Sequence, residues 1–437
     1  MAAARTHDRE ILRLALPALG ALAAEPLYVL ADTAIVGHLG TRQLGALALA
    51  ATALSAVVVL CNFLAYGTTA QVARLHGAGQ HARAAQIAAQ ALWLALGLGV
   101  LLALAVLALA HPLMLVLGGT GDAARLAERY LRLSAAGLPF ALVALSGQGY
   151  LRGVDRLRAP LVVLVTANLV NVALELVLVY GLDLGLDGSA LGTVVAQAGM
   201  GAAFAVLLLR AGGPEVSRRP RWADLRSLLR LGGDLLVRTG SLLLAFTLAG
   251  AVVARTSTAA LAAHQIAFQL FIFLALVLDA IAIAGQIIVG RALGAGDGAG
   301  AVAAARRMLG WSLVVGCGFG VLLLALTSVL PRAFTGDPAV LGQAHDLWPL
   351  FALLQPAGAV VFALDGILIG AGDTRYLARA MAFSAVVVFV PLALASLALD
   401  GGVVGVWVAI DVLMVARLVT MGARFRGGRW AVLGATA

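Results

Sequence analysis

The sequence predicts an all-α polytopic membrane protein, with twelve transmembrane helices in two parallel six-helix lobes. Of the 437 residues, 62% are hydrophobic and only 12% are charged, whereas about a quarter of the residues in a soluble domain are charged. Apolar runs of about twenty residues recur along the whole chain, and each is long enough to cross a hydrocarbon core of about 30 Å as a helix. The two halves of the chain also align with each other, which indicates a duplicated bundle.

Charges, glycines and prolines between the apolar runs mark the ends of the predicted helices. The first apolar run is longer than the core of a signal peptide and has no small-residue cleavage site, so we expect it to be retained. The predicted helices span residues 10–38, 44–74, 84–117, 123–151, 158–181, 187–210, 226–255, 259–291, 299–331, 338–370, 376–399 and 402–424.

The basic residues predict the orientation of the chain. All 30 are arginine, because the sequence contains no lysine. With the predicted helices, 23 of them fall on the side of the N-terminus, 6 fall on the opposite side, and Arg238 lies inside the seventh helix. The absence of lysine indicates the genome of a GC-rich bacterium, and positive charge gathers on the cytoplasmic side. We therefore expect a bacterial inner-membrane protein with both termini in the cytoplasm. The arginines are dispersed between apolar runs, which argues against a nucleic-acid partner.

One gapless offset of 217 residues aligns several separated stretches of the two halves. It places Pro139 on Pro356 and Gly153 on Gly370, among other matches. Helices 1 and 7 both begin on the arginine-rich side, so the two lobes have the same orientation and form parallel repeats. This symmetry is typical of transporters that alternate access between two lobes, and it argues against a structural or channel-like membrane protein.

The longest polar link between helices falls almost midway along the chain. We therefore predict an N-lobe of helices 1–6 over residues 1–211, a cytoplasmic linker over 212–224, and a C-lobe of helices 7–12 with a short tail over 225–437.

Three stretches resemble the MATE (multidrug and toxic compound extrusion) family, and within it the DinF-like branch. The first runs from Pro17 to Gly40 and contains Asp32, the second runs from Asp279 to Asp297, and the third, Leu364-Asp-Gly-Ile-Leu-Ile-Gly-Ala-Gly-Asp-Thr-Arg375, is similar to the end of helix 10. The resemblance covers nearly the whole chain. It implies that a proline, here Pro17, bends helix 1, and that an aspartate, here Asp32, takes the coupling ion.

The resemblance implies the export of amphipathic, often cationic compounds in exchange for protons or sodium. The alternative is a flippase for a lipid-linked or polysaccharide precursor, which would favour rows of basic residues facing the cavity. Only Arg238 is available for that role in the predicted helices. The NorM-like branch carries further acids in helices 7 and 10, and Asp365 lies too near the cytoplasmic end to match them.

Acidic residues inside the bilayer are costly and are functional candidates on that ground alone. At about 1.5 Å per residue, Asp32 in helix 1 and Glu175 in helix 5 both lie about 12–15 Å from the outer surface. Asn168, Asn171 and Glu175 follow at spacings of three and four, so they share one face of helix 5. We expect these four residues to line one cavity of the N-lobe.

Two acids that share a low-dielectric cavity can bind and release a proton near neutral pH. The oxygens of Asp32, Asn171 and Glu175 could alternatively take sodium. The structural alternative for each acid is a protonated carboxyl that is hydrogen-bonded to a neighbouring helix. Glu25 shares the side of helix 1 that carries Asp32, and it either belongs to the cavity or faces a loop.

The second half has its own charged candidates. Arg238 in helix 7 and Asp279 in helix 8 lie at equal depth, which makes an ion pair plausible, while Asp234 competes for the same arginine. Such a pair serves either helix packing or gating. Asp365 and Asp373 predict a cytoplasmic charge cluster for gate closure, with a solvated loop as the alternative.

Other features predict packing. His264 is expected to pack at the outer end of helix 8, and Cys61 and Cys317 are expected in the core. The glycine runs at 97–99 and 316–320 lie inside helices, so they indicate close helix contacts and not nucleotide loops. No Walker motif, metal cluster or nucleophile elbow occurs, so we expect no enzyme activity and no cofactor besides an ion gradient. The expected partners are amphipathic small molecules and membrane lipids, and the chain is expected to be a monomer.

Overall fold

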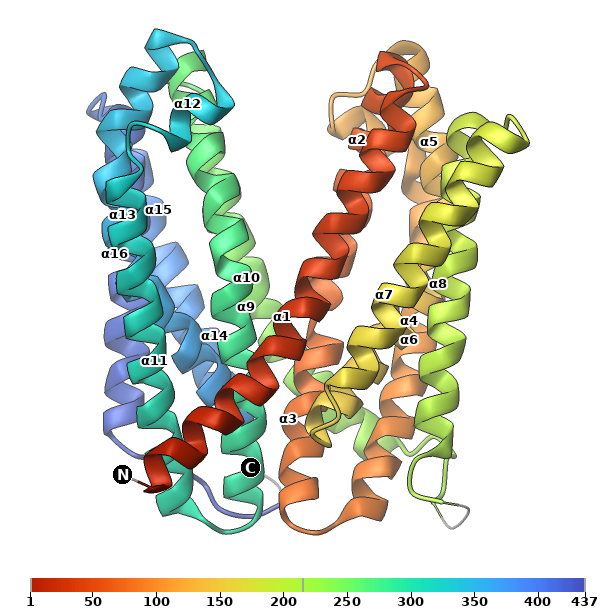
Figure 1. Cartoon of the computed structure of the whole chain (residues 1–437), viewed down its shortest axis with the longest axis vertical. Helices are drawn as coiled ribbons and strands as arrows, with labels where there is room; N and C mark the ends of the chain where they lie inside the picture. Colours follow the sequence, from red (N-terminus) through yellow and green to blue (C-terminus); the bar gives the residue numbers. More distant parts are fainter. Residues whose placement is uncertain (1, 214–215, 436–437) are drawn as a thin grey trace. The chain divides into compact units, whose positions relative to one another are not determined.

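The computed structural model describes residues 2–213 and 216–435, and within these ranges every regular element is a helix (Figure 1). Eleven helices of the described residues are long and apolar enough to cross a membrane, and one bent pair provides a twelfth span. The predicted all-α fold with twelve spans is confirmed, and the chain is a multi-pass membrane protein.

The helices of the first half include one π-helical segment, η1. In chain order they are α1 (Ala2–Gly37), α2 (Thr41–Cys61), α3 (Phe63–Gly77), α4 (His81–Val116), α5 (Gly121–Ala135), α6 (Leu138–Gly153), α7 (Arg158–Glu175), η1 (Leu176–Gly181) and α8 (Gly185–Arg210).

The helices of the second half include a second π-helical segment, η2. They are α9 (Trp222–Val253), α10 (Thr258–Gly294), α11 (Gly298–Ala325), α12 (Leu330–Phe334), α13 (Pro338–Gly370), α14 (Thr374–Ala382), η2 (Phe383–Phe389), α15 (Val390–Ala398) and α16 (Gly402–Arg426).

Several predicted spans are not single straight helices. The second is divided at Asn62 into α2 and α3, and the fourth is bent by 53° between α5 and α6. Pro139 lies at the start of α6, where its missing N–H costs the helix no hydrogen bond. The fifth and eleventh spans continue into η1 and η2, so both contain the wider turns that often mark functional sites.

The contacts divide the chain into two compact units, Gly20–Gly232 and the combination of Met1–Leu19 with Gly233–Ala437. This division differs from the predicted one at both ends of the first unit. The predicted N-lobe began at residue 1 and ended at 211, but the start of α1 groups with the second half. Residues 212–232, which include the whole predicted linker, group with the first half.

Side-chain contacts explain why the linker belongs to the first unit. Gln90 on α4 donates from Nε2 to the Arg219 carbonyl (2.9 Å) and accepts from the Arg221 N–H (2.8 Å). The buried Asp224 forms an ion pair with Arg83 on α4. These contacts fasten both the linker and the start of α9 to α4.

The start of α1 is fastened to the second unit in a similar way. Asp8 accepts two hydrogen bonds from the Arg307 guanidinium (2.6 and 2.7 Å) and one from the Trp311 indole (2.8 Å), both on α11. Glu10 pairs with Arg291 on α10. The helix α1 therefore passes from one unit to the other at Leu19–Gly20 without interruption.

The packing within each unit repeats at the offset found in the sequence. A Cβ atom built on Gly149 would lie 2.6 Å from the Ala65 carbonyl oxygen, and one built on Gly366 would lie 2.1 Å from the Ala282 carbonyl oxygen. Both members of the second pair follow the first by the same 217 residues. In each unit, a glycine therefore lets two helices approach to backbone contact, α3 with α6 and α10 with α13.

We expect Gly366→Ala to destabilise the second unit by about 1–3 kcal/mol, because a methyl group at this position overlaps the Ala282 carbonyl and forces α10 and α13 apart. The apparent melting temperature of the purified protein in detergent measures the effect. Gly358→Ala is the matched control on the same helix, because a Cβ there meets no atom within 4 Å. Equal melting temperatures for the two variants would contradict this account of the repeat.

Within the glycine runs of α4 and α11, Gly99, Gly316 and Gly320 make the predicted close helix contacts, whereas a Cβ on Gly97 or Gly318 would meet no atom within 4 Å. Cβ atoms built on Gly99 and Gly316 would lie 2.4 Å and 2.9 Å from the Cα atoms of Pro139 and Pro356, again a pair related by the repeat. Cys61 is buried as expected, but the prediction for Cys317 is wrong, because this residue is exposed. Since Gly316 faces α13, the next residue along α11 is turned away from the bundle.

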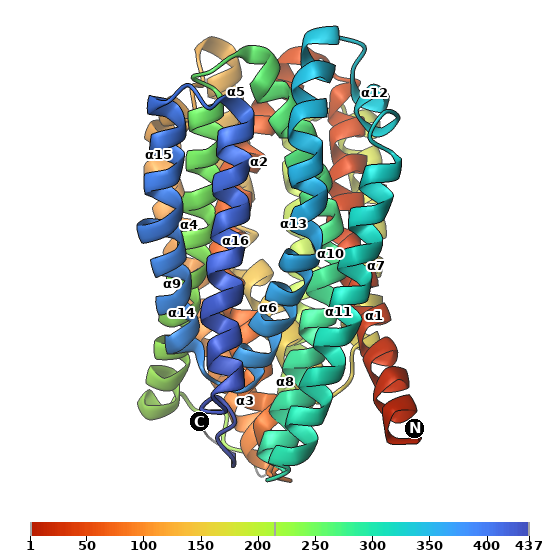
Figure 2. The same cartoon turned by 90° about the vertical axis from the view of Figure 1, so that its left-hand side faces the viewer.

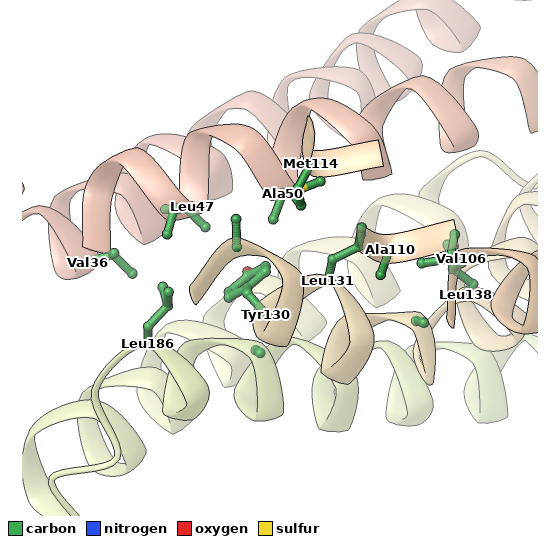
Figure 3. Close-up of a cluster of buried hydrophobic side chains, with 14 of the residues drawn as sticks. Val36, Leu47, Ala50, Val106, Ala110, Met114, Tyr130, Leu131, Leu138 and Leu186 are labelled. Atoms are coloured by element: carbon green, nitrogen blue, oxygen red, sulfur yellow. The ribbon is translucent and has the colours of Figure 1, made fainter. Parts of the chain in front are cut away.

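The first unit has a core of buried side chains contributed by α1, α2, α4, α5, α6 and α8 (Figure 3). Tyr130 on α5 is 4% exposed and lies among Leu47 and Leu186, which come from other helices. This packing fixes one wall of the cavity described below.

The second unit is organised around α13, which packs against α10, α11 and α16 (Figure 2). An aromatic cluster joins three of these helices. His264 stacks on Phe268 with ring centroids 5.8 Å apart and contacts Trp407 edge-on at 5.9 Å, and Trp407 contacts Phe351 at 5.5 Å. His264 is 2% exposed and is a packing residue, as predicted.

Candidate functional site

A cavity of ≈ 470 Å³ lies inside the first unit. It is lined by side chains from α1, α2, α3, α5, α6, α7 and α8, mostly apolar ones. Its polar residues concentrate where α1, α7 and α8 meet, and they include Asp32, Asn168 and Asn171. The structure therefore brings predicted residues of helices 1 and 5 into one site.

Asp32 lies in the wall of this cavity and is only 6% exposed. Ser189 on α8 donates a hydrogen bond from Oγ to Asp32 Oδ1 (2.7 Å). This donor stabilises a carboxylate, and it also fixes the direction in which the carboxyl group points.

Glu175, at the end of α7, is fully buried and is not among the side chains that line the cavity, so only three of the four residues predicted to line it do so. Tyr28 on α1 donates to Glu175 Oε1 (3.3 Å) and shares a hydrogen bond with the Thr193 hydroxyl on α8 (2.9 Å). The Asp32 and Glu175 side chains are close enough to interact. The two acids and the hydroxyls of α1 and α8 thus form one continuous polar group.

Two asparagines complete the polar face predicted for helix 5. Asn168 donates to the Ala24 carbonyl of α1 (2.9 Å), and Asn171 donates to Thr193 Oγ1 (3.4 Å). Gly192 makes this approach possible, because a Cβ there would lie 3.2 Å from Glu175 Cγ and 3.3 Å from Asn171 Oδ1. A larger residue would push α8 away from α7.

Two buried acceptors of this group have no hydrogen-bond partner among the described residues, Glu175 Oε2 and Asn171 Oδ1. Orphaned acceptors in a low-dielectric site are costly, and a proton or a small cation would satisfy them. The π-helical segment η1 begins at the residue after Glu175. Its wider turn changes the face that the helix presents beyond the acid.

Sequence reasoning did not select three hydroxyl residues of this site, Tyr28, Ser189 and Thr193. The sequence does place each of them four residues from another polar residue of the site, which is a spacing that shares one helix face. Tyr28 lies four residues before Asp32 and shares its face of α1, and Ser189 and Thr193 are also four residues apart on α8. Hydroxyl residues are tolerated widely in membrane helices, so the pattern became informative only when the structure placed these helices together.

Glu25 lines the cavity and is exposed within it, which answers the question that the sequence left open. Pro17 does not line the cavity. It lies in an uninterrupted part of α1, two residues before the point at which the helix passes to the other unit. Among the described residues, no group of three His, Cys, Asp or Glu side chains could hold a metal ion.

Asp365 is the centre of a buried charge cluster in the second unit. Its Oδ2 accepts from Arg238 on α9 (2.5 Å) and from Arg417 on α16 (2.6 Å), and the Asp365 and Arg417 side chains are 3% and 2% exposed. The equal-depth argument matched Arg238 with Asp279, which stays a prediction, and it did not select Asp365. Depth along a helix says nothing about the direction in which a side chain points around it.

Asp365 and Asp373 do not form one cluster at the surface. Asp373 pairs with Arg424 (2.6 Å) nearer the end of the bundle, whereas Asp365 is enclosed by α9, α13 and α16. Asp234 accepts from the Thr374 hydroxyl (3.1 Å). Asp411 on α16 is half-buried, and neither of its carboxyl oxygens has a partner among the described residues.

The profile of the MatE family matches residues 17–177 and 241–394, which is most of the chain and includes the site on α1 and α7. The chain belongs to the MatE family. Among relatives, DNA damage-inducible protein F of Escherichia coli is 30% identical over 98% of this chain and 95% of its own length. A probable multidrug resistance protein NorM of Bradyrhizobium diazoefficiens is 32% identical over 92% of this chain and 90% of its own.

Solved MatE structures share the fold. A crystal structure described as MATE in the bent conformation has a TM-score of 0.88 at 21% identity, covering 98% of this chain and 95% of its own. MatE proteins are efflux transporters, and the fold of this chain is the fold of a transporter. The predicted resemblance to the MATE family is confirmed. The similarity to DNA damage-inducible protein F agrees with the predicted DinF-like branch.

Proposed function

We propose that this protein exports lipophilic, cationic compounds in exchange for protons, by alternating access between the two sides of the membrane. The observation that carries the proposal is the pair of buried acids, Asp32 and Glu175, held beside an apolar cavity by hydroxyl donors from α1 and α8.

The charge of the cavity favours a cation as the exported compound. Its lining contains two acids, Glu25 and Asp32, and one arginine, Arg152, which donates to Gln148 (3.0 Å). A cavity with apolar walls and an excess of acids attracts amphipathic cations. A flippase for phosphate-bearing precursors would need the opposite charge. The NorM relative, a probable multidrug resistance protein, supports a substrate of this kind.

Proton exchange follows from competition for the same negative charge. A cationic compound is attracted while Asp32 is ionised, and protonation removes that attraction, so the compound leaves. Tyr28 connects Glu175 to Thr193, so a change in the charge of Glu175 alters the hydrogen bonds of both hydroxyl groups. Sodium is the alternative ion, because Asp32, Asn171 and Glu175 offer oxygen ligands of the type that it prefers.

We further propose that α1 bends near Pro17 when the site is protonated, since a proline removes one hydrogen bond of the helix and eases bending there. The bend would shrink the cavity around Asp32. The arginine distribution of 23 to 6 supports a bacterial inner membrane with both termini in the cytoplasm. We expect the protein to act as a monomer.

Purified protein in liposomes, driven by one ion gradient at a time, tests the proposed function. We expect a cationic dye to be transported when a pH gradient is imposed, and we expect a sodium gradient alone to have no effect. Transport driven only by a sodium gradient would show that the coupling ion is sodium, bound at Asp32, Asn171 and Glu175, and not a proton. No dye transport in either gradient, with transfer of a phosphate-bearing lipid instead, would establish the flippase alternative.

A further inference from the structure

A second hollow lies in the other unit and shares no lining residue with the cavity around Asp32. It is a groove of ≈ 880 Å³ whose lining comes from α11, α13, α16 and the tail that follows α16. The helix α13 packs against both α11 and α16 (Figure 2), and side chains of all three helices line the groove. The lining is mostly apolar, with Val302 and Leu309 on α11, Val360 and Leu364 on α13, and Leu418 and Val419 on α16.

Two arginines line the same groove, Arg306 on α11 and Arg426 at the last residue of α16. Both are exposed, and neither has an acidic partner among the described residues. Their neighbours in sequence differ in this respect. Arg307 pairs with Asp8, and Arg424 pairs with Asp373. The two arginines that line the groove therefore carry positive charges that no carboxylate of the described residues compensates.

The residues that follow α16 are held in place by contacts within the second unit, and they close one end of the groove. Gly428, at φ 68°, turns the chain back after α16, and Trp430 stacks on Phe425 with ring centroids 5.3 Å apart and donates from its indole to the Phe425 carbonyl (3.0 Å). The Gly434 N–H then donates to the Leu293 carbonyl at the end of α10 (3.0 Å). Because Gly428 and Trp430 also line the groove, its shape beside Arg426 is built before any ligand arrives.

Position along the helices relates the groove to the membrane. Arg306 lies eight residues after the start of α11, and Arg426 ends α16, so both lie toward the arginine-rich end of the bundle. Part of the apolar lining, such as Leu309 on α11 and Val360 on α13, lies farther from that end of the helices than the two arginines do, whereas Val302 lies nearer to it than Arg306. Charged groups at headgroup depth, followed by an apolar channel toward the hydrocarbon core, match the two parts of a phospholipid.

We propose that this groove binds an anionic diacyl phospholipid from the leaflet on the arginine-rich side of the membrane. Its phosphate would lie between Arg306 and Arg426, and an acyl chain would follow the apolar lining of α11, α13 and α16. Two uncompensated guanidiniums favour a headgroup with a net negative charge over a zwitterionic one, because the ammonium group of the latter would be repelled. The site lies outside the acidic cavity, so the proposal does not depend on the proposed transport mechanism.

Thermal unfolding of the full-length protein in detergent tests this proposal, with phosphatidylglycerol or phosphatidylcholine of identical acyl chains added. We expect phosphatidylglycerol to raise the melting temperature, with an apparent affinity at least about tenfold higher than that of phosphatidylcholine. The double variant Arg306→Gln, Arg426→Gln should lose this preference. Arg429→Gln is the matched control, because it removes an exposed arginine of the tail that does not line the groove.

A third variant tests the apolar part of the groove while the arginines stay in place. A Cβ built on Gly422 meets no atom within 4 Å, and this residue lines the groove, so Gly422→Leu should fill it without disturbing the helices. We expect normal melting without lipid and loss of the stabilisation by phosphatidylglycerol. Equal effects of the two lipids would overturn the proposal, and so would equal stabilisation by inorganic phosphate, which would indicate a site for free anions.

Discussion

Asp32→Asn should abolish export driven by a pH gradient while the protein still folds. An asparagine keeps the size of the side chain, and its carbonyl oxygen can still accept the hydrogen bond from Ser189. It cannot gain and lose a proton, so the exchange cycle has no group at this site that changes charge. Substrate binding should persist in weakened form, since the cavity keeps its apolar walls and Glu25.

Dye transport in liposomes with an imposed pH gradient measures this effect, and dye binding to the purified variant separates binding from coupling. Asp183→Asn is the matched control. Asp183 lies between η1 and α8, is exposed, and has a φ of 53°, which asparagine also tolerates. A full transport rate and an unchanged pH profile in Asp32→Asn would place the coupling elsewhere, and the C-lobe acids Asp279 and Asp365 would be examined next.

The neighbouring acid should give a milder result. In Glu175→Gln the amide can still accept from Tyr28, so the network around Thr193 is retained. The transport rate should fall and its pH dependence should shift, because two interacting acids titrate as a pair and one of them is now missing. This graded difference distinguishes a coupled pair from two independent structural acids.

Asp365→Asn should cause the largest loss of stability in the second unit. Two guanidiniums, from Arg238 and Arg417, would then share a buried site without any negative charge from Asp365. Removing one partner from a buried ion pair typically costs about 3–5 kcal/mol. We expect a strongly lowered melting temperature and poor recovery of monodisperse protein.

Asp373→Asn is the matched control, because its ion pair with Arg424 is more exposed, at 14% and 23% for the two side chains, and is worth less. A rescue variant distinguishes the effect of an unpaired buried charge from the effect of altered side-chain packing. Replacing Asp365, Arg238 and Arg417 together by leucine and methionine removes all three charges, and stability should recover at least in part. Normal melting of Asp365→Asn would show that the cluster does not stabilise the unit.

The sequence by itself determined the fold class and most of the candidate site. Hydrophobic runs longer than a bilayer require helices, because every backbone polar group must be satisfied inside the segment. The offset of 217 residues predicted two equivalent lobes, and the close helix contacts at Gly149 and Gly366 repeat at that offset. The spacing of Asn168, Asn171 and Glu175 predicted one polar face, because the helical period fixes which residues share a side.

Only the tertiary structure decided which groups complete these sites. Helical periodicity gives depth and face within one helix, but not the rotation of one helix against another. Ser189 and Thr193 therefore joined the acidic site only when Gly192 let α8 approach α7. Asp365 became the partner of Arg238 and Arg417 for the same reason, since three helices turn these charges toward one point. The division of α1 between two units likewise depends on contacts made far along the chain, which local sequence patterns do not encode.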